Sequence, residues 1–289
     1  CFDLEKDLLV KPRLLHVGGD DFLFLTLHHL VTDGVSWRIL LDDLALLLSQ
    51  QDRGESVRLA PKSDSYRRFA LGLPAQARTN VPAADGGFLR ADALMAHVTA
   101  SRRLTGELVR RQGPSGEGGM QGILLCALYR AMARLGAGPE LVVELEGHGR
   151  DLVPQACVER TVGWFTRFRL LRLSPWQEAA TAHGAMPRMR EIPGADTSVP
   201  AGRRIRFNYL GQLGMQNKDW FEPLPSVWPG DVGGSNRMAC RLCVDLMLTR
   251  GCLEVYFTFD AGDTLGARLP DVFLKALEEG TKEPFSADR

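Results

Sequence analysis

The sequence predicts an α/β protein built from two unequal parts. Its 289 residues are 45% hydrophobic and 24% charged, which is the composition of a globular chain with a sizeable core. Helical and strand-like patterns alternate in the larger, C-terminal part. A stretch rich in proline, glycine and alanine at residues 72–87 separates this part from a smaller one. We therefore expect domains at residues 1–75 and 91–289, joined by a linker at 76–90.

The smaller part shows one strand pattern and one helix pattern. Residues 22–27 form an apolar run, which favours a strand at residues 21–29 that is covered on both faces. After a short loop, apolar residues recur at about the helical period, which predicts a helix over residues 35–50.

The larger part mixes helices with strands. The pair at residues 241–249 and 252–259 is joined by Arg250-Gly251, which predicts an antiparallel hairpin. We expect helices at 101–111, 122–135 and 270–279, and strands at 141–145, 161–173, 204–210, 241–249 and 252–259.

Charge and hydropathy narrow the class of protein. Lysine and arginine number 35, as do aspartate and glutamate, so no net field attracts nucleic acid or an anionic membrane. The longest apolar runs, at residues 22–27 and 44–48, are too short to cross a bilayer. No charged leader with a cleavage site opens the sequence, which starts at Cys1 as if it were cut from a longer chain. We expect a cytoplasmic protein.

Six cysteines are spread thinly along the chain, so reduced thiols are expected rather than a disulfide framework. Cys240 and Cys243 form a C-x-x-C pattern. Because a strand is predicted from residue 241, and residues three apart on a strand point to opposite faces, we expect no metal or redox chemistry from this pair.

The strongest chemical signal is His28-His29-Leu-Val-Thr-Asp33-Gly34, placed between the first strand and the first helix. Successive strand residues point to opposite faces, so only one histidine can reach a given cavity. We expect His29 to be the active one, while His28 packs or forms hydrogen bonds elsewhere. Asp33, followed by the flexible Gly34, suits a supporting role. No third histidine or suitably spaced cysteine lies nearby, so a metal site is not expected.

Residues 28–41, HHLVTDGVSWRILL, resemble the signature of the condensation and epimerization domains of nonribosomal peptide synthetases. Three further segments are similar to epimerization-domain motifs and follow the order of that family. They are Glu146-Gly-His-Gly-Arg150, Thr161-Val-Gly-Trp-Phe-Thr166 and Phe207-Asn-Tyr-Leu-Gly-Gln212.

The resemblance implies a chloramphenicol-acetyltransferase-like fold of two lobes. Only 27 residues precede the His-His motif, so most of the N-terminal lobe is expected to lie outside this chain. The substrate would be a thioester on the 4'-phosphopantetheine arm of a peptidyl carrier protein, and neighbouring synthetase modules would be partners. The chain would need no cofactor of its own.

The same resemblance implies inversion of an α-carbon by removal and return of a proton. The acid/base groups map to His29 and Glu146, and the family tyrosine maps to Tyr209. Glu146 follows a predicted buried strand, where burial raises the pKa of a carboxyl toward neutrality. Tyr209 and Asn208 could donate hydrogen bonds to an enolate oxygen.

Two supporting residues complete the predicted site. Arg150 is a candidate partner of Asp33 or of Glu146, and Trp164 is expected to pack near the tunnel that admits the substrate arm. Two other functions remain open. One is a condensation domain, which uses the same histidine motif to form an amide. The other is an inactive remnant that only docks a carrier protein.

Overall fold

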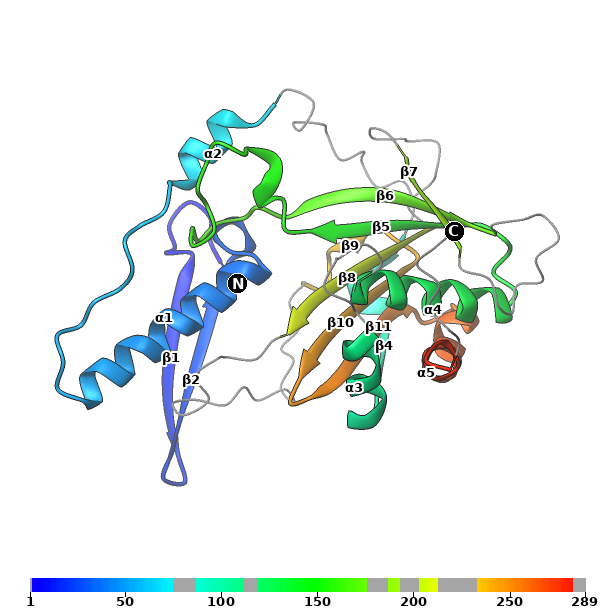
Figure 1. Ribbon diagram of the computed structural model, residues 1–289, viewed down its shortest axis with the longest axis horizontal. Coiled ribbons are helices and arrows are strands. Elements are labelled where there is room, and N and C mark those ends of the chain that lie inside the picture. Colours follow the sequence, from blue (N-terminus) through cyan, green and yellow to red (C-terminus); the bar gives the residue numbers. More distant parts are fainter. Residues whose placement is uncertain are drawn as a thin grey trace. The chain divides into compact units, whose positions relative to one another are not determined.

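The computed structural model describes residues 2–74, 87–111, 119–175, 187–192, 203–212 and 233–282. These residues form two compact units (Figure 1). Among them, unit 1 holds 2–74 and 148–167, and unit 2 holds the rest. The segment 148–167, which was expected in the C-terminal domain, lies in unit 1. The expected linker at 76–90 lies mostly outside the described residues.

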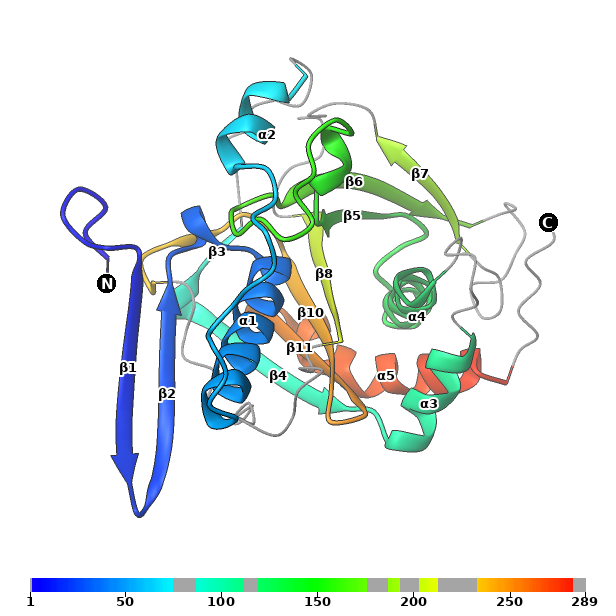
Figure 2. The same ribbon diagram turned by 60° about the vertical axis from the view of Figure 1, so that its left-hand side comes forward.

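Unit 1 begins with a two-stranded antiparallel hairpin of β1 (Val10–Val17) and β2 (Asp20–Leu27) (Figure 2). The turn is made by two glycines with positive φ, a conformation that glycine adopts without strain. The expectation that β2 is covered on both faces is wrong for the described residues, since Leu23 and Phe24 are exposed. The strand β1 was not predicted.

Three helical segments follow in unit 1. A 3-10 turn, η1 (His29–Val31), leads into α1 (Gly34–Asp52), and α2 (Tyr66–Gly72) comes later in the chain. A second 3-10 turn, η4 (Arg150–Leu152), comes from the distant segment 148–167. A small apolar core joins α2 to that segment and consists of Phe69, Val153, Ala156, Val158 and Phe165.

Unit 2 is built on a mixed seven-stranded sheet of order β4-β11-β10-β8-β5-β6-β7. β8 runs parallel to both β5 and β10, whereas β10 and β11 form the predicted antiparallel hairpin. The predicted strand at 161–173 begins later, at Arg167, and β4 was not predicted. The strands are β4 (Ala93–Thr99), β5 (Leu141–Gly147), β6 (Arg167–Ser174), β7 (Arg188–Ile192), β8 (Arg204–Gln212), β10 (Leu242–Thr249) and β11 (Cys252–Asp260).

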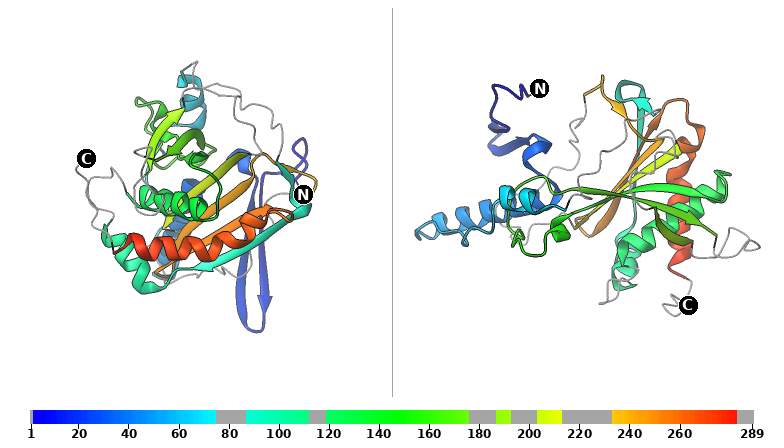
Figure 3. Two further views of the ribbon diagram at one scale, coloured as in Figure 1. Left: turned by 90° about the vertical axis from the view of Figure 1, so that its right-hand side faces the viewer. Right: turned by 90° about the horizontal axis from the view of Figure 1, so that it is seen from above.

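Three helices cover one face of this sheet, α3 (Arg102–Arg111), α4 (Met120–Arg134) and α5 (Thr264–Gly280) (Figure 3). Alternate residues of each strand point toward this face, and their side chains pack against the helices to form the main core. Its largest fully buried members include Phe207, Phe257 and Phe273. Two short strands, β3 (Phe88–Leu89) and β9 (Arg237–Met238), form an antiparallel pair. The 3-10 turn η3 (Arg90–Asp92) follows β3 in the chain, and β10 follows β9.

The opposite face of the sheet carries polar residues. Glu144 and Arg206 are aligned on the adjacent strands β5 and β8, and their neighbours on the core face, Leu145 and Phe207, are fully buried. The alternation of strand residues therefore puts the charged groups of β5 and β8 together on the face away from the helices. This arrangement positions the candidate residues of unit 2.

Candidate functional site

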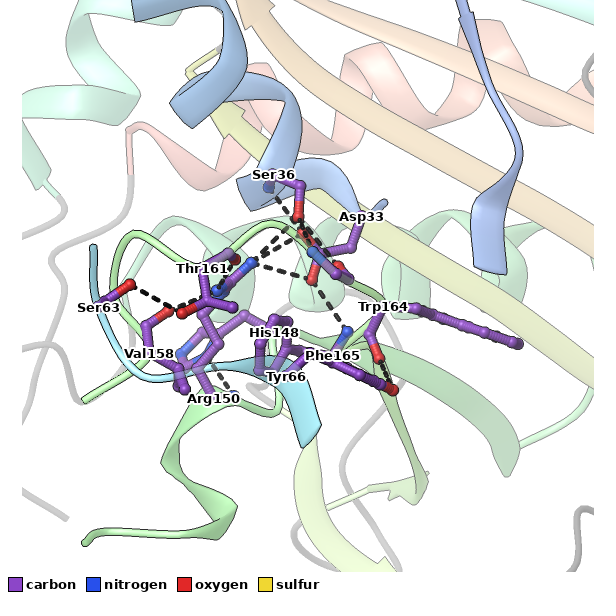
Figure 4. Close-up of polar contacts among 11 residues, drawn as sticks. Asp33, Ser36, Ser63, Tyr66, His148, Arg150, Val158, Thr161, Trp164 and Phe165 are labelled. Atoms are coloured by element: carbon purple, nitrogen blue, oxygen red, sulfur yellow. Dashed lines mark hydrogen bonds and ion pairs between the residues drawn. The ribbon is translucent and has the colours of Figure 1, made fainter. Parts of the chain in front are cut away.

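The carboxylate of Asp33 is the centre of a polar cluster in unit 1 (Figure 4). Asp33 is the N-cap of α1, and its Oδ1 accepts a hydrogen bond from the backbone N–H of Ser36 at 2.7 Å. Its Oδ2 accepts one from the N–H of Phe165 at 3.1 Å. The side chain is only 3% exposed, so these bonds and the pairing with Arg150 replace water around a buried charge.

Arg150 ties this cluster to the segment 148–167. Its Nη2 lies 3.1 and 3.3 Å from the two carboxylate oxygens of Asp33, and its Nη1 donates to the carbonyls of Val158 and Thr161 at 2.7 Å each. The guanidinium also stacks over the ring of Phe165 at 4.0 Å. Burial lowers the pKa of Arg150 and the carboxylate of Asp33 opposes that change. Of the two partners expected for Arg150, the structure places it on Asp33.

Ser36 and Gly163 close the same cluster. The hydroxyl of Ser36 donates to the Gly163 carbonyl at 2.9 Å and accepts from the Gly163 N–H at 3.1 Å. A Cβ at Gly163 would lie 2.6 Å from the Tyr66 ring, so a side chain does not fit there. Sequence reasoning missed Ser36, because the contacts of its hydroxyl are with Gly163, 127 residues away, and no local pattern signals them.

The two histidines have different environments, as the motif suggested. His28 caps η1, and its Nδ1 accepts a hydrogen bond from the N–H of Leu30 at 3.1 Å. His29 is exposed, and its ring centroid lies 5.3 Å from that of Trp164. The strand ends at Leu27, so both histidines belong to the turn rather than to the predicted strand. Gly34 is the first residue of α1.

Trp164 departs from the expected packing role, because it is 38% exposed while its neighbour Phe165 is buried in the small core. The hydroxyl of Tyr66 holds the Trp164 carbonyl at 2.8 Å (Figure 4). The backbone of Trp164 is thus anchored within unit 1, and its indole lies beside the imidazole of His29.

In unit 2, Glu146 lies near the C-terminal end of β5 and is partly exposed. Burial raises the pKa of its carboxyl to about 7. Arg206 lowers that pKa and Glu144 raises it, but both effects are smaller than burial. Glu146 therefore exists in comparable protonated and ionised fractions near neutral pH, as an acid/base group requires.

The charge of Arg206 is held by Glu144 rather than by Glu146. Nε and Nη2 of Arg206 lie 2.8 and 2.7 Å from Oε1 of Glu144, whose side chain is 6% exposed. The buried guanidinium of Arg204 lies 3.9 Å from the other oxygen of Glu144. Sequence reasoning missed the pairing of Glu144 with Arg206. The signal was the alternation of charged residues within the otherwise apolar strands β5 and β8.

The predicted pair Asn208 and Tyr209 is divided between the two faces of β8. Asn208 follows Arg206 by two residues, just as Glu146 follows Glu144, so Asn208 shares the polar face with Glu146. Tyr209 is aligned with Leu246 of β10 and packs against the helix-covered core. The structure thus brings Asn208 to the face of Glu146 and places Tyr209 on the other face.

The expected separation of the C-x-x-C residues on opposite faces of a strand is wrong. Cys240 lies in a bend before β10, which begins only at Leu242, so the alternation of strand residues does not separate the two cysteines. Their Sγ atoms are 3.0 Å apart. Among the described residues, no group of three or more His, Cys, Asp or Glu side chains could hold a metal ion.

The helix-covered mixed sheet of unit 2 places the chain in the α/β class that the sequence predicted. Within the part of the chain that can be described, no helix is long and apolar enough to cross a membrane.

Comparisons with known proteins narrow this class. A family model described as a condensation domain matches residues 1–80. Bacitracin synthase 3 of Bacillus licheniformis is 30% identical over 325 residues, which cover 99% of this chain and 5% of that synthase. The chain thus spans a small fraction of this much longer relative.

Two solved structures share the fold. The epimerization domain from the third module of tyrocidine synthetase B superposes with a TM-score of 0.75 at 24% identity, covering 97% of this chain and 73% of that one. The first condensation domain of the CDA synthetase superposes with a TM-score of 0.61 at 18% identity, covering 96% and 68%. The chain is thus similar to condensation-superfamily domains of nonribosomal peptide synthetase subunits, and the predicted chloramphenicol-acetyltransferase-like fold class is confirmed.

Proposed function

We propose that this chain epimerizes the α-carbon of an aminoacyl or peptidyl thioester bound to the phosphopantetheine arm of a carrier protein. One observation carries the proposal. Glu146 is a carboxyl with a pKa of about 7 on the polar face of the sheet, and Arg206, the cation that lowers this pKa, is already paired with Glu144. Such a carboxyl can both accept and return a proton at neutral pH.

The reaction needs a base that removes the α-proton and an acid that returns one to the opposite face. A thioester acidifies the neighbouring C–H bond, because the charge left after deprotonation spreads onto the thioester oxygen. The ionised form of Glu146 accepts the α-proton, and a second group protonates the resulting enolate from the opposite face. We assign His29 to that second role, either as the acid or as a cation that stabilises the enolate. After that step Glu146 holds the proton taken from the α-carbon and His29 has given one up, so proton exchange with solvent restores both groups before the next turnover.

Asn208 is the best candidate to stabilise the enolate oxygen. It shares the polar face with Glu146 and is partly exposed, so its amide can donate a hydrogen bond to a bound substrate. Tyr209 packs against the core, so its hydroxyl is a weaker candidate for the same role. We therefore expect Asn208→Ala to slow the reaction more than Tyr209→Phe does.

The substrate would arrive on a partner. The relatives are multi-module synthetases, in which substrates are carried as thioesters, so a peptidyl carrier protein and adjacent modules are the proposed partners. The fold is more similar to that of an epimerization domain (TM-score 0.75) than to that of a condensation domain (TM-score 0.61), which supports epimerization as the proposed reaction.

The test is exchange of the α-proton. The full chain is incubated with an L-aminoacyl carrier protein in D₂O, and deuterium incorporation and the D/L ratio of the released amino acid are measured. We expect incorporation together with both stereoisomers. Glu146→Gln should lower the exchange rate by about 10²-fold or more. Glu140→Gln is the matched control, because Glu140 is exposed and pairs only with Arg172 in the described part of unit 2.

Unchanged exchange in Glu146→Gln would remove Glu146 from its proposed role. The second candidate function is condensation, which is favoured by the family model that matches residues 1–80. Offering a second aminoacyl carrier as acceptor separates the two, since a dipeptide thioester formed without deuterium incorporation would assign the chain to condensation.

A further inference from the structure

The C-x-x-C pair of unit 2 has no part in the proposed reaction, yet its two thiols are in contact. Cys240 and Cys243 are 0% and 3% exposed, and their Sγ atoms lie 3.0 Å apart. A disulfide bond is about 2.05 Å long, so the sulfurs would have to move only about 1 Å closer to bond. The neighbouring backbone already holds them together.

The bend that carries Cys240 is fixed on both sides. Before it, Met238 pairs with Phe88 in the short β3–β9 ladder. After it, the N–H of Arg241 donates to the carbonyl of Arg204 at 2.8 Å, and the Arg241 side chain pairs with Asp263, the N-cap of α5, at 2.8 Å. The bend therefore cannot easily move Cys240 away from Cys243.

A guanidinium lies beside the pair. Cys243 is aligned with Arg206 on the neighbouring strand, so the two side chains share the polar face of the sheet. The hydrogen bond from Cys243 lowers the pKa of the Cys240 thiol, and Arg206 lowers it further against the effect of burial. The pKa of Cys243 is raised by the same hydrogen bond and by burial. Cys240 lies in the bend, which can open locally, whereas Cys243 is held in the ladder of β10, so we assign Cys240 as the attacking thiolate and Cys243 as the resolving thiol.

We propose that Cys240 and Cys243 form a reversible dithiol–disulfide site that reacts with small disulfides of the glutathione type. The Cys240 thiolate attacks one sulfur of oxidised glutathione, which forms a mixed disulfide and releases one glutathione thiolate. The Cys243 thiolate then attacks Sγ of Cys240, which forms the Cys240–Cys243 bond and releases the second glutathione thiolate. The two cysteine protons end on the two glutathione molecules, and the protein is oxidised by two electrons while the glutathione disulfide is reduced.

This site is independent of the proposed epimerization, because none of its steps involves His29 or Glu146. Both sulfurs are buried, so we expect exchange to be slow and to require local opening of the bend. The equilibrium, in contrast, should favour the disulfide more in the folded chain than in an unfolded one, because the fold holds the two sulfurs in place before they react.

Trypsin offers a direct readout, since it cleaves after Arg241, between the two cysteines. The full chain is equilibrated with defined ratios of reduced and oxidised glutathione, quenched with acid, alkylated and digested. A Cys240–Cys243 bond keeps residues 238–241 and 242–250 joined as one species until reduction separates them. We expect the equilibrium constant for this species to be about tenfold higher in the native chain than in the urea-unfolded chain.

Two variants serve as controls. Cys240→Ser should abolish the joined peptides, whereas Cys126→Ser, which removes a buried thiol of α4, should leave their yield unchanged. The exposed Cys157 reports that the oxidant is active, since it should become glutathionylated. The proposal is overturned if Cys157 is modified while the two peptides stay separately alkylated, or if the native chain forms the bond no more readily than the unfolded one.

Discussion

At the scale of single residues, two carboxylates of this chain lie in contrasting surroundings. Asp33 is buried and accepts hydrogen bonds from Arg150 and from two backbone N–H groups, which stabilise its charge. Glu146 is partly exposed, the neighbouring Arg206 is paired with Glu144, and burial raises the pKa of the Glu146 carboxyl to about 7. Asp33 is thus suited to a structural role in unit 1, and Glu146 is suited to proton transfer.

The raised pKa of Glu146 predicts a pH dependence of stability. Below pH 4.5 this carboxyl is protonated in both the folded and the unfolded chain. As the pH rises, the unfolded chain ionises first, so the free energy of unfolding falls until about pH 7 and then levels off. Glu146→Gln removes this effect. Its stability relative to the wild type should increase by about 1–3 kcal/mol between pH 5 and pH 8.

Urea unfolding of both proteins at the two pH values measures that difference. Glu140→Gln serves again as the control, because an exposed carboxyl should give a difference near zero. A pH-independent difference between Glu146→Gln and the wild type would show that burial does not perturb Glu146.

Asp33→Asn tests the fixed charge. The substitution leaves the guanidinium of Arg150, which is 9% exposed, without its counter-charge, so we expect a loss of about 3–5 kcal/mol in the free energy of unfolding. Asp43→Asn on α1 is the matched control. Asp43 pairs with the more exposed Arg160, and its loss should cost about 1 kcal/mol or less. Equal losses for the two variants in urea unfolding would argue against a special role for the buried pair.

At the scale of elements, the turn that leads into η4 depends on one glycine. Gly149 has a φ of 59°, and a Cβ there would lie 2.1 Å from the carbonyl oxygen of Phe165. Gly251, in the β10–β11 turn, also has a positive φ, but a Cβ there would meet nothing within 4 Å. Gly149→Ala should therefore cost about 3–4 kcal/mol, the sum of backbone strain and a steric clash, and Gly251→Ala about 1–2 kcal/mol.

Thermal or urea unfolding of the two alanine variants measures this comparison directly. Because both positions carry the same backbone strain, the difference between them isolates the contact with Phe165. If Gly149→Ala were no more destabilising than Gly251→Ala, the close approach of residues 149 and 165 would be disproved.

Elements with a strong local pattern could be predicted from the sequence. The helix after the His-His motif and the hairpin through Arg250-Gly251 follow from local periodicity and turn chemistry, and the structure has both. The strand β1 contains a proline and two charged residues, so it lacks the apolar run that marks a buried strand. β4 lies at the edge of the sheet with Leu94 and Met95 exposed, and its short apolar run does not by itself distinguish a strand from a helix. The pairing partners of such strands define them, and pairing is not a local property.

The candidate site was predicted only in part, for a similar reason. The motifs identify residue types, but the position where a strand begins decides which side chains share a face. One such boundary, at Leu242, brings Cys240 to Cys243, and another, at Arg167, leaves Trp164 outside any strand. Boundaries are set by distant contacts such as that between Arg241 and Asp263, which sequence periodicity does not report.

At the scale of the whole molecule, the order of the chain does not match its compact units. Residues 148–167 leave unit 2 after β5 and supply unit 1 with Arg150 and with most of its small apolar core. Unit 2 has a separate and much larger core beneath α3, α4 and α5. Each unit therefore has its own source of stability, and local damage in one should not spread evenly through the other.

Amide hydrogen exchange of Asp33→Asn tests this division. Losing the anchor of Arg150 should speed exchange by about tenfold or more in α1, α2 and residues 148–167, because these segments share the polar cluster and the small core. The amides of β8, β10 and β11 should keep their wild-type rates, since their ladder is covered by the helices of unit 2. Phe207→Ala, which empties a fully buried position in β8, should give the reverse pattern. If either variant accelerated exchange equally in both units, the chain would open as one cooperative body, and the second core would offer unit 2 no separate protection.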